Sequence, residues 1–391
     1  MPSMLKIALP ALAAASTAYA ASCSTSATKT IQNAGDATAL AGCETFTGSI
    51  AIATSTTEDI ALNGVQKIVG DLIATNNSDI KQISGDSLTQ LDGEMHLDGL
   101  TSLYALNFPA LKSVDTITWN ALPNLQDLGF GSEVESANKI DIQNTGLRSL
   151  AGINVEEADS IEISNNGYIN EIKLQLGNVS TKLTLATNNE AVIVELPFLI
   201  WASNLTFISC ASVSVPSLET LNGSLGLYEN GFESFVAPNL TSVGDALVIV
   251  DNEKLSNLSF PLLTKVSGNL KIANNPELAE IDGFPELASI GGAFDMAGNF
   301  TSVETPALDT LKGAFNLQSS ENVNETCAFY EGLRDEKAIR GKYECKGRLI
   351  DPGEEGHKGT SKGNDPEGAA SSLSAVNGAL GLAAVAAVLL F

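Results

Sequence analysis

The stretch Gly268-Asn269-Leu270-Lys271-Ile272-Ala273-Asn274-Asn275 contains the pattern that decides the fold of this chain. A glycine stands two residues before an apolar-x-apolar triplet, and an asparagine stands five residues after the triplet begins. The same triplet recurs at intervals of 20 to 24 residues. Its copies begin at Ile50, Leu72, Met95, Ile117, Ile140, Ile161, Leu183, Leu205, Leu225, Leu247, Leu270, Phe294 and Phe315. Self-similarity at such a period is typical of a solenoid of stacked coils.

The triplet itself predicts a short β-strand. Its first and third residues point inward and its middle residue points outward, because side chains alternate along a strand. One coil cannot bury its own apolar face, so neighbouring coils must stack with parallel strands in register. Helical periodicity is nearly absent from these coils. We therefore expect an all-β fold, a right-handed parallel β-helix or leucine-rich-repeat-like solenoid of about 13 coils.

A ladder of asparagines is predicted to follow the strands. Seven coils have asparagine five residues after the triplet begins: Asn77, Asn166, Asn188, Asn230, Asn252, Asn275 and Asn299. Stacked at one position, these side chains would hydrogen-bond the turn backbone of neighbouring coils. Cys210 holds the same position in its coil. We interpret it as a buried, reduced thiol, with a reactive or intermolecular thiol as the alternative.

The remaining cysteines predict two caps, which an open stack needs because its end strands expose unpaired edges. Cys23 and Cys43 bracket the segment before the first triplet, and Cys327 and Cys345 bracket the segment after the last. Each pair is expected to form a disulfide that staples a cap. Residues 328–340 predict an amphipathic helix that covers the last coil.

Charge and composition exclude several functions. The 391 residues include 46 Asp and Glu against 21 Lys and Arg, a net charge of -25. This balance argues against a nucleic-acid partner and against electrostatic docking to a membrane. Only two histidines are present, His96 and His357, so most histidine-based metal sites and catalytic triads are excluded. We expect no cofactor and no metal.

Both ends of the chain resemble targeting signals. Lys6, the apolar residues 7–18 and Ala18-Tyr19-Ala20 have the order of a secretory signal peptide. Small residues at 368–370, a polar spacer at 371–378 and an apolar tail at 379–391 have the order of a glycosylphosphatidylinositol (GPI) attachment signal. We expect Gly368 to carry the lipid, and the protein to lie on the outer leaflet of the plasma membrane and in the cell wall or extracellular space.

Eight Asn-x-Ser/Thr sequons agree with secretion. Asn299 is one of them, but its ladder position predicts an inward amide that accepts no glycan. The asparagines expected to be glycosylated are Asn76, Asn178, Asn204, Asn222, Asn239, Asn257 and Asn324.

The segment Gly42-Cys43-Glu44-Thr45-Phe46-Thr47-Gly48-Ser49-Ile50-Ala51-Ile52 resembles the opening of a receptor L domain, with its C-x-x-x-x-G-x-L-x-I motif. Together with the signal peptide, the later coils, the acidic stalk and the C-terminal tail, it makes the whole chain resemble the fungal GPI-anchored cell-wall-organisation proteins of the extracellular-mutant and sporulation-specific group. This resemblance implies a wall and plasma-membrane glycoprotein needed for wall integrity, without assigned catalytic activity or active-site residues. The receptor mode of ligand binding does not transfer, because this chain has many more coils than one L domain.

Six segments are expected along the chain. They are a signal peptide (1–20), an N-terminal cap (21–49), a receptor L-domain-like repeat solenoid (50–320), a C-terminal helical cap (321–345), a flexible stalk (346–368) and a GPI propeptide removed on anchoring (369–391).

Three functions fit this architecture. We favour a non-enzymatic scaffold or binding module for wall polysaccharide or wall glycoproteins. The alternative is a glycan-active β-helix hydrolase or transglycosylase using Asp141 and Glu162, which point outward from adjacent coils, roughly 5 Å apart as in retaining enzymes. A receptor-like ectodomain for a protein ligand would need an exposed apolar patch on the sheet. His96 beside Asp98 supplies too few ligands for a metal site, and Trp119 is expected in the core rather than as a sugar-stacking platform.

Overall fold

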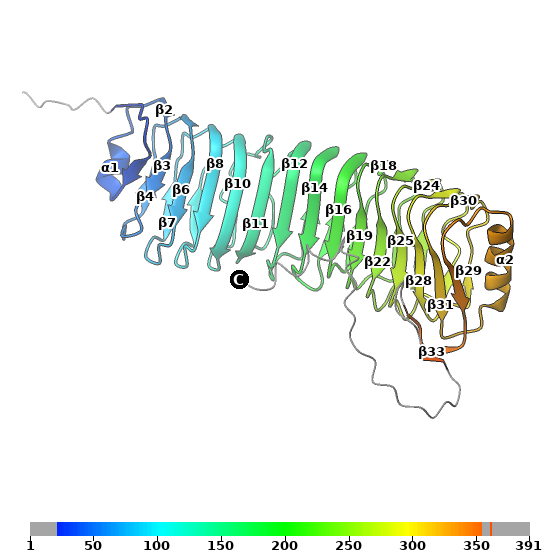
Figure 1. Cartoon of the computed structure of the whole chain (residues 1–391). Coiled ribbons are helices and arrows are strands. Elements are labelled where there is room, and N and C mark those ends of the chain that lie inside the picture. The colour runs from blue at the N-terminus through cyan, green and yellow to red at the C-terminus, as the bar shows by residue number, and fades with distance from the viewer. Residues whose placement is uncertain (1–21, 354–359, 362–391) are drawn as a thin grey trace, which may run out of the picture.

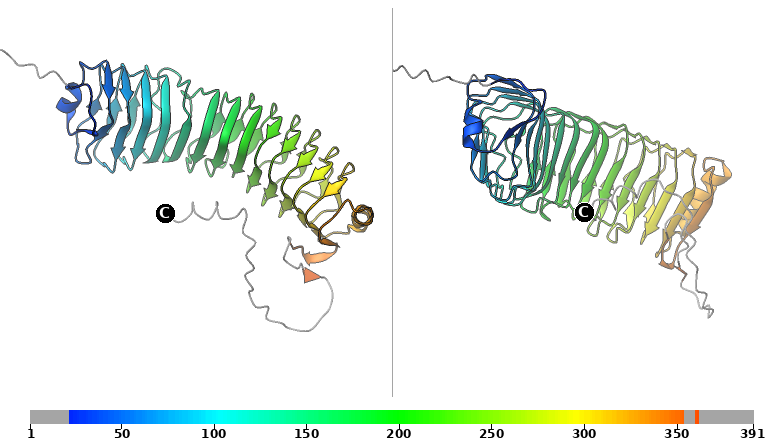
Figure 2. Two further views of the ribbon diagram at one scale, coloured as in Figure 1. Left: turned by 45° about the horizontal axis from the view of Figure 1, so that its top comes forward. Right: turned by 60° about the vertical axis from the view of Figure 1, so that its left-hand side comes forward.

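The structure is a computed structural model that describes residues 22–353 and 360–361. The expected signal peptide, Gly368 and the propeptide lie outside these residues. The described chain is a long, curved rod of parallel strands that runs from helix α1 (Ala34–Thr38) to helix α2 (Asn324–Asp335), as Figure 1 shows. Figure 2 shows the curvature of the rod and, viewed obliquely from its N-terminal end, the closed outline of the coils.

One parallel sheet of 22 strands forms the principal wall of the rod, and we call it the main sheet. Its strands are β1 (Lys29–Ile31), β2 (Thr45–Thr47), β3 (Ile50–Ile52), β5 (Lys67–Val69), β6 (Leu72–Thr75), β8 (Gln90–Asp98), β10 (Ser113–Leu122), β11 (Lys139–Thr145), β12 (Glu157–Ser164), β14 (Asn178–Ala186), β16 (Trp201–Ile208), β18 (Thr220–Leu221), β19 (Leu225–Tyr228), β21 (Ser242–Val243), β22 (Leu247–Val250), β24 (Lys265–Val266), β25 (Leu270–Ala273), β27 (Ser289–Ile290), β28 (Phe294–Gly298), β30 (Thr310–Leu311), β31 (Phe315–Ser319) and β32 (Tyr343–Lys346).

Smaller parallel sheets form another wall of the solenoid. They are built from β4 (Ile60–Ala61), β7 (Gln82–Ser84) and β9 (Ala105–Asn107); from β13 (Glu171–Lys173), β15 (Ile193–Glu195) and β17 (Ser212–Ser214); from β20 (Ser234–Val236) and β23 (Asn257–Ser259); and from β26 (Glu280–Ile281) and β29 (Ser302–Val303). A separate antiparallel pair joins β33 (Leu349–Asp351) to β34 (Thr360–Ser361).

The register of the main sheet follows the repeat seen in the sequence. Leu247 pairs with Leu225 on one side and with Leu270 on the other, so equivalent triplet residues stand side by side. The first and third residues of the triplets are buried, as Leu247 and Ile249 illustrate with no exposed surface. These observations confirm the predicted β-solenoid of about 13 turns. Strands β1 and β32 extend the main sheet by pairing with the first and last of these coils.

Stacked aromatic rings add to the aliphatic core near the C-terminal end. Phe260 and Phe284 stack with their ring centroids 5.1 Å apart, and Phe294 and Phe315 stack at 4.9 Å. Tyr343 continues the second stack onto Phe315 at 4.9 Å. Aromatic pairs in such arrangements contribute more than their buried area alone. The core therefore continues from the repeats into the C-terminal segment.

The asparagine ladder forms, with a difference in one coil. Asn230, Asn252 and Asn275 are buried and hydrogen-bonded to one another in succession. Asn299 has the same spacing but is only partly buried, and its Nδ2 donates to the carbonyl oxygen of Pro276. Asn299 therefore buries its Oδ1 as predicted but does not join the hydrogen bonds of the ladder. Strand β28 is one residue longer than β25, so the turn begins later and the fully buried position falls on Phe300.

Both predicted disulfides are present. Cys23 and Cys43 close the N-terminal end with their Cα atoms 5.5 Å apart. The sequence did not suggest helix α1 within this segment. The helix begins after Asn33, whose Oδ1 accepts the Asp36 backbone N–H at 3.1 Å, the usual bond of a helix N-cap.

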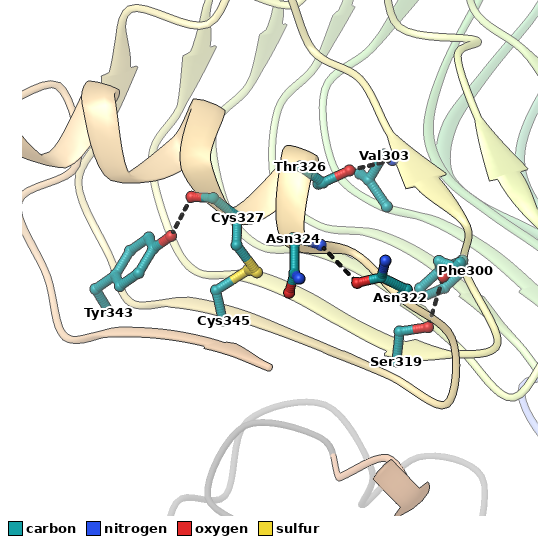
Figure 3. Close-up of a disulfide and its surroundings, with 9 residues drawn as sticks. All are labelled: Phe300, Val303, Ser319, Asn322, Asn324, Thr326, Cys327, Tyr343 and Cys345. Carbon is teal, nitrogen blue, oxygen red and sulfur yellow. Dashed lines mark hydrogen bonds between the residues drawn. A yellow bond between two sulfur atoms is a disulfide. The ribbon is translucent and has the colours of Figure 1, made fainter. Parts of the chain in front are cut away.

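The C-terminal cap is shown in Figure 3, where the bond between Cys327 and Cys345 joins helix α2 to strand β32. The Tyr343 hydroxyl donates to the Cys327 carbonyl oxygen at 3.0 Å and holds the same two elements together. Helix α2 begins and ends earlier than the predicted 328–340. It buries Thr326 and Tyr330, and its end is followed by Lys337, whose positive φ of 65° cannot continue a helix.

Candidate functional site

The main sheet is the largest sheet of the described residues, and we call its solvent side the outward face. The middle residues of successive triplets pair in register and form one continuous row across it. This outward row consists of Ala51, Ile73, His96, Thr118, Asp141, Glu162, Thr184, Thr206, Gly226, Val248, Lys271, Asp295, Asn316 and Glu344.

A second row runs parallel to the first, two residues further along each strand. It consists of Thr75, Asp98, Asn120, Gln143, Ser164, Ala186, Ile208, Tyr228, Val250, Ala273, Ala297, Gln318 and Lys346. Because both rows lie on one side of the pleated sheet, their side chains form a single surface. Neighbouring strands beneath this surface are about 4.8 Å apart.

The N-terminal part of the outward face is a connected polar network. Asn120 Nδ2 donates to Asp98 Oδ1 at 2.8 Å, and Asn144 Nδ2 donates to Asn120 Oδ1 at 2.8 Å. Each of these bonds joins one coil to the next. The network fixes the direction of the amide groups, so the surface has a defined arrangement of donors and acceptors.

Asp141 and Glu162 are in-register neighbours, as the sequence predicted. Both carboxylates are engaged by other side chains. Gln143 Nε2 donates to Asp141 Oδ1 at 2.7 Å and to Glu162 Oε1 at 3.4 Å. Lys182 Nζ donates to Glu162 Oε2 at 2.5 Å and neutralises its charge. The pair is therefore part of the polar network.

The middle of the outward face is uncharged. Thr206, Gly226 and Val248 occupy the outward row here, and Ile208 and Val250 flank Tyr228 in the second row. Burial raises the pKa of the Tyr228 hydroxyl above its usual value. Gly226 is the middle, outward residue of the triplet that begins at Leu225, but the sequence did not single out Tyr228. The signal was the glycine in a row of larger side chains, with an aromatic residue two positions later.

The C-terminal end of the outward face is covered by the chain itself. Gly353 donates its backbone N–H to Gln318 Oε1 at 3.0 Å, and its carbonyl oxygen accepts from Asn316 Nδ2 at 3.1 Å. Asn316 also donates to Asp295 Oδ1 at 2.7 Å. These three polar side chains are buried, whereas Asp141, Gln143 and Glu162 in the same two rows are partly exposed. The covering segment includes β33, which lies within the range predicted as stalk.

His96, Trp119 and Cys210, which the sequence raised as candidates for other roles, each make contacts that support the fold. His96 Nδ1 lies 3.2 Å from Glu94 Oε1 rather than bonding Asp98. Trp119 is fully buried, and its ring centroid lies 5.8 Å from that of Phe130. Cys210 is free and buried in the ladder, where its backbone N–H donates to Asn230 Oδ1 at 2.9 Å. Burial raises the pKa of its thiol to about 12.

Within residues 22–353 and 360–361, no group of three or more His, Cys, Asp or Glu side chains could hold a metal ion. In that same part of the chain, no helix is long and apolar enough to cross a membrane.

Comparisons with known proteins identify relatives along nearly the whole chain. Residues 3–41 match the Ecm33 family model, described as "GPI-anchored cell wall organization protein". Protein ecm33 of Aspergillus fumigatus is 40% identical over 360 residues, which cover 91% of this chain and 89% of the relative. The "Cell surface GPI-anchored protein" of Arthroderma benhamiae is 38% identical and covers 96% of this chain and 98% of its own length.

A more distant relative is the sporulation-specific protein 2 of Saccharomyces cerevisiae. It is 35% identical over 335 residues, which cover 84% of this chain and 66% of the relative. No solved structure matches this chain.

Proposed function

Because this chain belongs to the Ecm33 family of GPI-anchored cell wall organization proteins, we propose that it is a non-catalytic scaffold of the fungal cell wall. In this proposal the rod is held on the outer leaflet of the plasma membrane and in the wall, and its outward face binds wall polysaccharide or wall glycoproteins. The description of the family model and the name of the Arthroderma benhamiae relative, a cell surface GPI-anchored protein, support this role.

The observation that carries the proposal is the unbroken register of the outward face from Ala51 to Lys271, ahead of the C-terminal end that the chain itself covers. A row with one side chain per strand repeats along the rod at the strand spacing of about 4.8 Å. Such a surface suits an extended ligand, which can contact one coil after another. Binding then depends on the sum of many weak contacts along the rod.

The arrangement of Asp141 and Glu162 favours a scaffold over a glycan-active enzyme. A retaining glycosidase needs one carboxyl group to act as acid and a second to attack the sugar, both reaching the same bond. Here Gln143 and Lys182 hold the oxygens of the two carboxylates on a sheet surface. Two hollows of the described surface lie elsewhere, one beside Asp92 and Asp115 and the other beside Glu229 and Asp251.

The proposal also includes the processing expected from the sequence. The signal peptide (1–20) is removed, Gly368 receives the lipid after loss of residues 369–391, and the seven sequons other than Asn299 carry glycans. The seven expected glycosylation sites are all at least partly exposed in the structure, whereas Asn299, which is not expected to carry a glycan, has a buried Oδ1. The positions of the seven sites are therefore compatible with modification.

The test is a double substitution, Asp141→Asn with Glu162→Gln, in a strain that lacks the protein. A scaffold should fold, reach the surface and restore wall integrity nearly as well as the unchanged chain, because partly exposed acids contribute little to stability. A catalytic pair should fail to restore it, because losing an acid or base costs orders of magnitude in rate. Incubation of the protein with β-glucan, chitin and mannan should show binding without cleavage. A displayed double variant that fails in the wall assay would overturn the scaffold.

A further inference from the structure

Tyr228 lies on the outward face in a way that no other described residue of the two rows repeats. It is the only aromatic phenol or indole side chain in these rows, and Gly226 is their only glycine. A Cβ atom built on Gly226 would lie 2.4 Å from Tyr228 Cε2 and 3.1 Å from Cζ and Oη. The far edge of the tyrosine ring therefore occupies the place that a side chain at 226 would fill.

This contact fixes the orientation of the ring. Gly226 and Tyr228 belong to one strand and point to the same side of the sheet, because side chains alternate along a strand. A tyrosine whose hydroxyl end reaches over the residue two positions earlier must lie down along its strand. Gly226 is buried beneath it, while Tyr228 stays partly exposed. The absence of a side chain at 226 thus leaves the space in which the ring packs against the sheet.

The surroundings of the ring are uncharged. Ile208 and Val250 stand beside Tyr228 on the neighbouring strands, and Thr206 and Val248 stand beside Gly226. All four are partly exposed. No described residue forms a hydrogen bond with Tyr228 Oη, and the raised pKa keeps the hydroxyl protonated as a donor. The patch combines an aromatic ring, aliphatic groups and free hydroxyl groups.

These groups match the chemistry of a pyranose ring. A sugar has an apolar face of C–H groups that can pack on an aromatic ring, and hydroxyl groups at its edge that need polar partners. Ligand sites of this kind are mainly apolar, with a few polar groups that fix orientation, and tyrosine supplies both an apolar body and a polar tip.

Charge decides between classes of polysaccharide. The patch itself has no charge, and the chain carries a net charge of -25. A polyanionic polysaccharide would be repelled by this field. An uncharged chain meets no such penalty and can extend along the outward row towards Thr184 and Glu162, whose oxygens are able to accept hydrogen bonds from sugar hydroxyls.

We propose that Tyr228, seated on Gly226 and flanked by Thr206, Ile208, Val248 and Val250, is a binding subsite for an uncharged pyranose chain of the cell wall. This inference rests on the proposed function and deepens it, because it names the ligand class and the place where a sugar unit stacks.

The test measures binding of the full chain, extracted in detergent, to three probes: insoluble β-1,3-glucan, chitin, and a polyanionic pectate. The unchanged protein should bind one or both uncharged probes and leave pectate in solution. Tyr228→Ala should weaken that binding at least tenfold, equivalent to about 1.4 kcal/mol. Tyr228→Phe keeps the ring and should bind within about threefold of the unchanged chain. Tyr168→Ala is the matched control, because Tyr168 is 66% exposed and lies outside the two rows.

Gly226→Ala provides a second route that keeps the tyrosine. The new methyl group meets the ring and should lift it from its seat, so binding should fall although Tyr228 is still present. Thermal unfolding of each variant shows whether the fold is intact. If Tyr228→Ala does not fold, the comparison of Gly226→Ala with Tyr228→Phe decides the question.

Three results would overturn the subsite. The first is that the unchanged chain and the folded Tyr228 and Gly226 variants bind equally well. The second is binding of pectate alone, and the third is no binding to any probe. Wall integrity in the null strain is scored separately. A Tyr228→Ala chain that loses polysaccharide binding but restores the wall confirms the subsite and removes polysaccharide binding from the proposed function. If polysaccharide binding depends on Tyr228 but wall integrity requires Asp141 and Glu162, the subsite is retained and the scaffold is overturned.

Discussion

The side-chain oxygen of Asn252 accepts two hydrogen bonds from Asn230, one from its backbone N–H at 2.9 Å and one from its Nδ2 at 3.0 Å. Asn252 repeats the same pair of bonds towards Asn275. Each asparagine thus accepts hydrogen bonds from the asparagine of the preceding coil and donates hydrogen bonds to that of the next coil. Because buried backbone groups must find partners, this ladder allows the turns to be packed without water.

Asn252→Ala should therefore destabilise the solenoid. The substitution removes the acceptor of a buried N–H on Asn230 and leaves the carbonyl oxygens of Leu227 and Val250 without this donor. We expect a loss of about 3 kcal/mol, the cost of a few unsatisfied buried groups. The control is Asn124→Ala, which removes a bond at an exposed turn and should cost under about 0.5 kcal/mol. Urea unfolding of both variants measures the difference, and equal midpoints would contradict the ladder.

Cys210 should resist alkylation in the folded protein. Burial raises its pKa to about 12, so at pH 8 on the order of one molecule in ten thousand has the reactive thiolate. Iodoacetamide should label Cys210 only after unfolding, while the four disulfide-bonded cysteines stay unlabelled without reductant. Mass mapping of the peptides checks this result. Rapid labelling of the native chain, or a disulfide on Cys210, would show that the thiol is not a closed ladder position.

The same shift should make the fold sensitive to alkali. The unfolded thiol titrates near pH 9 and the folded one near pH 12, so the unfolded chain binds fewer protons between these values and stability falls as pH rises. The contribution is fully present below about pH 9. Cys210→Ser lacks this titration and should show a shallower decline from pH 9 to 11. Parallel slopes of the urea midpoint would contradict the assignment.

Removing the C-terminal disulfide should loosen only the end of the rod. Cys327→Ser with Cys345→Ser opens a link across 18 residues, and such a link typically contributes 2–4 kcal/mol. Because each coil contacts only its neighbours, hydrogen exchange should rise in β31 and β32 and stay unchanged in β14 and β16. Uniform exchange along the whole rod would show that the solenoid opens as one unit.

Neighbouring residues of one strand should respond in opposite ways to the same change. Leu247→Asp places a charge without a partner in the core, where Leu247 is fully buried, and should abolish folding and secretion. Val248→Asp places the same charge on the outward face and should leave the fold intact. Surface display of each variant is the measurement. A displayed Leu247→Asp chain would contradict the inward phase of the triplets.

The repeat made most of the fold predictable, and local deviations from it account for the errors. The spacing of the triplets fixed which residues point inward, because that alternation is a property of every strand. Helix α2 was misplaced because its start depends on where the last coil ends, rather than on its own apolar pattern. Asn299 stays outside the hydrogen bonds of the ladder because one extra strand residue shifts the turn, and spacing alone does not show which side of the turn absorbs it.

The candidate site was predictable in its rows but not in its contacts. The register of Asp141 with Glu162 follows from the repeat. The bonds from Gln143 and Lys182 depend on rotamers, and the cover over Asn316 depends on a non-repetitive segment returning to the sheet. The packing of the Tyr228 ring over Gly226 depends on the absence of one side chain, and a periodic pattern of apolar residues does not reveal it.

The disulfide between Cys327 and Cys345 also determines how mechanical tension applied to the chain beyond Cys345 is transmitted to the rod. Tension arriving at Cys345 crosses the sulfur–sulfur bond to Cys327 and continues towards β31, so residues 328–344 form a slack loop outside the loaded path. The part of helix α2 after Cys327 and the first two residues of β32 then bear no force. Once the bonds from Gly353 to Asn316 and Gln318 have parted, the hydrogen bonds of β31 in the main sheet carry the load. The rod then resists as a chain of coils that detach one at a time from that end.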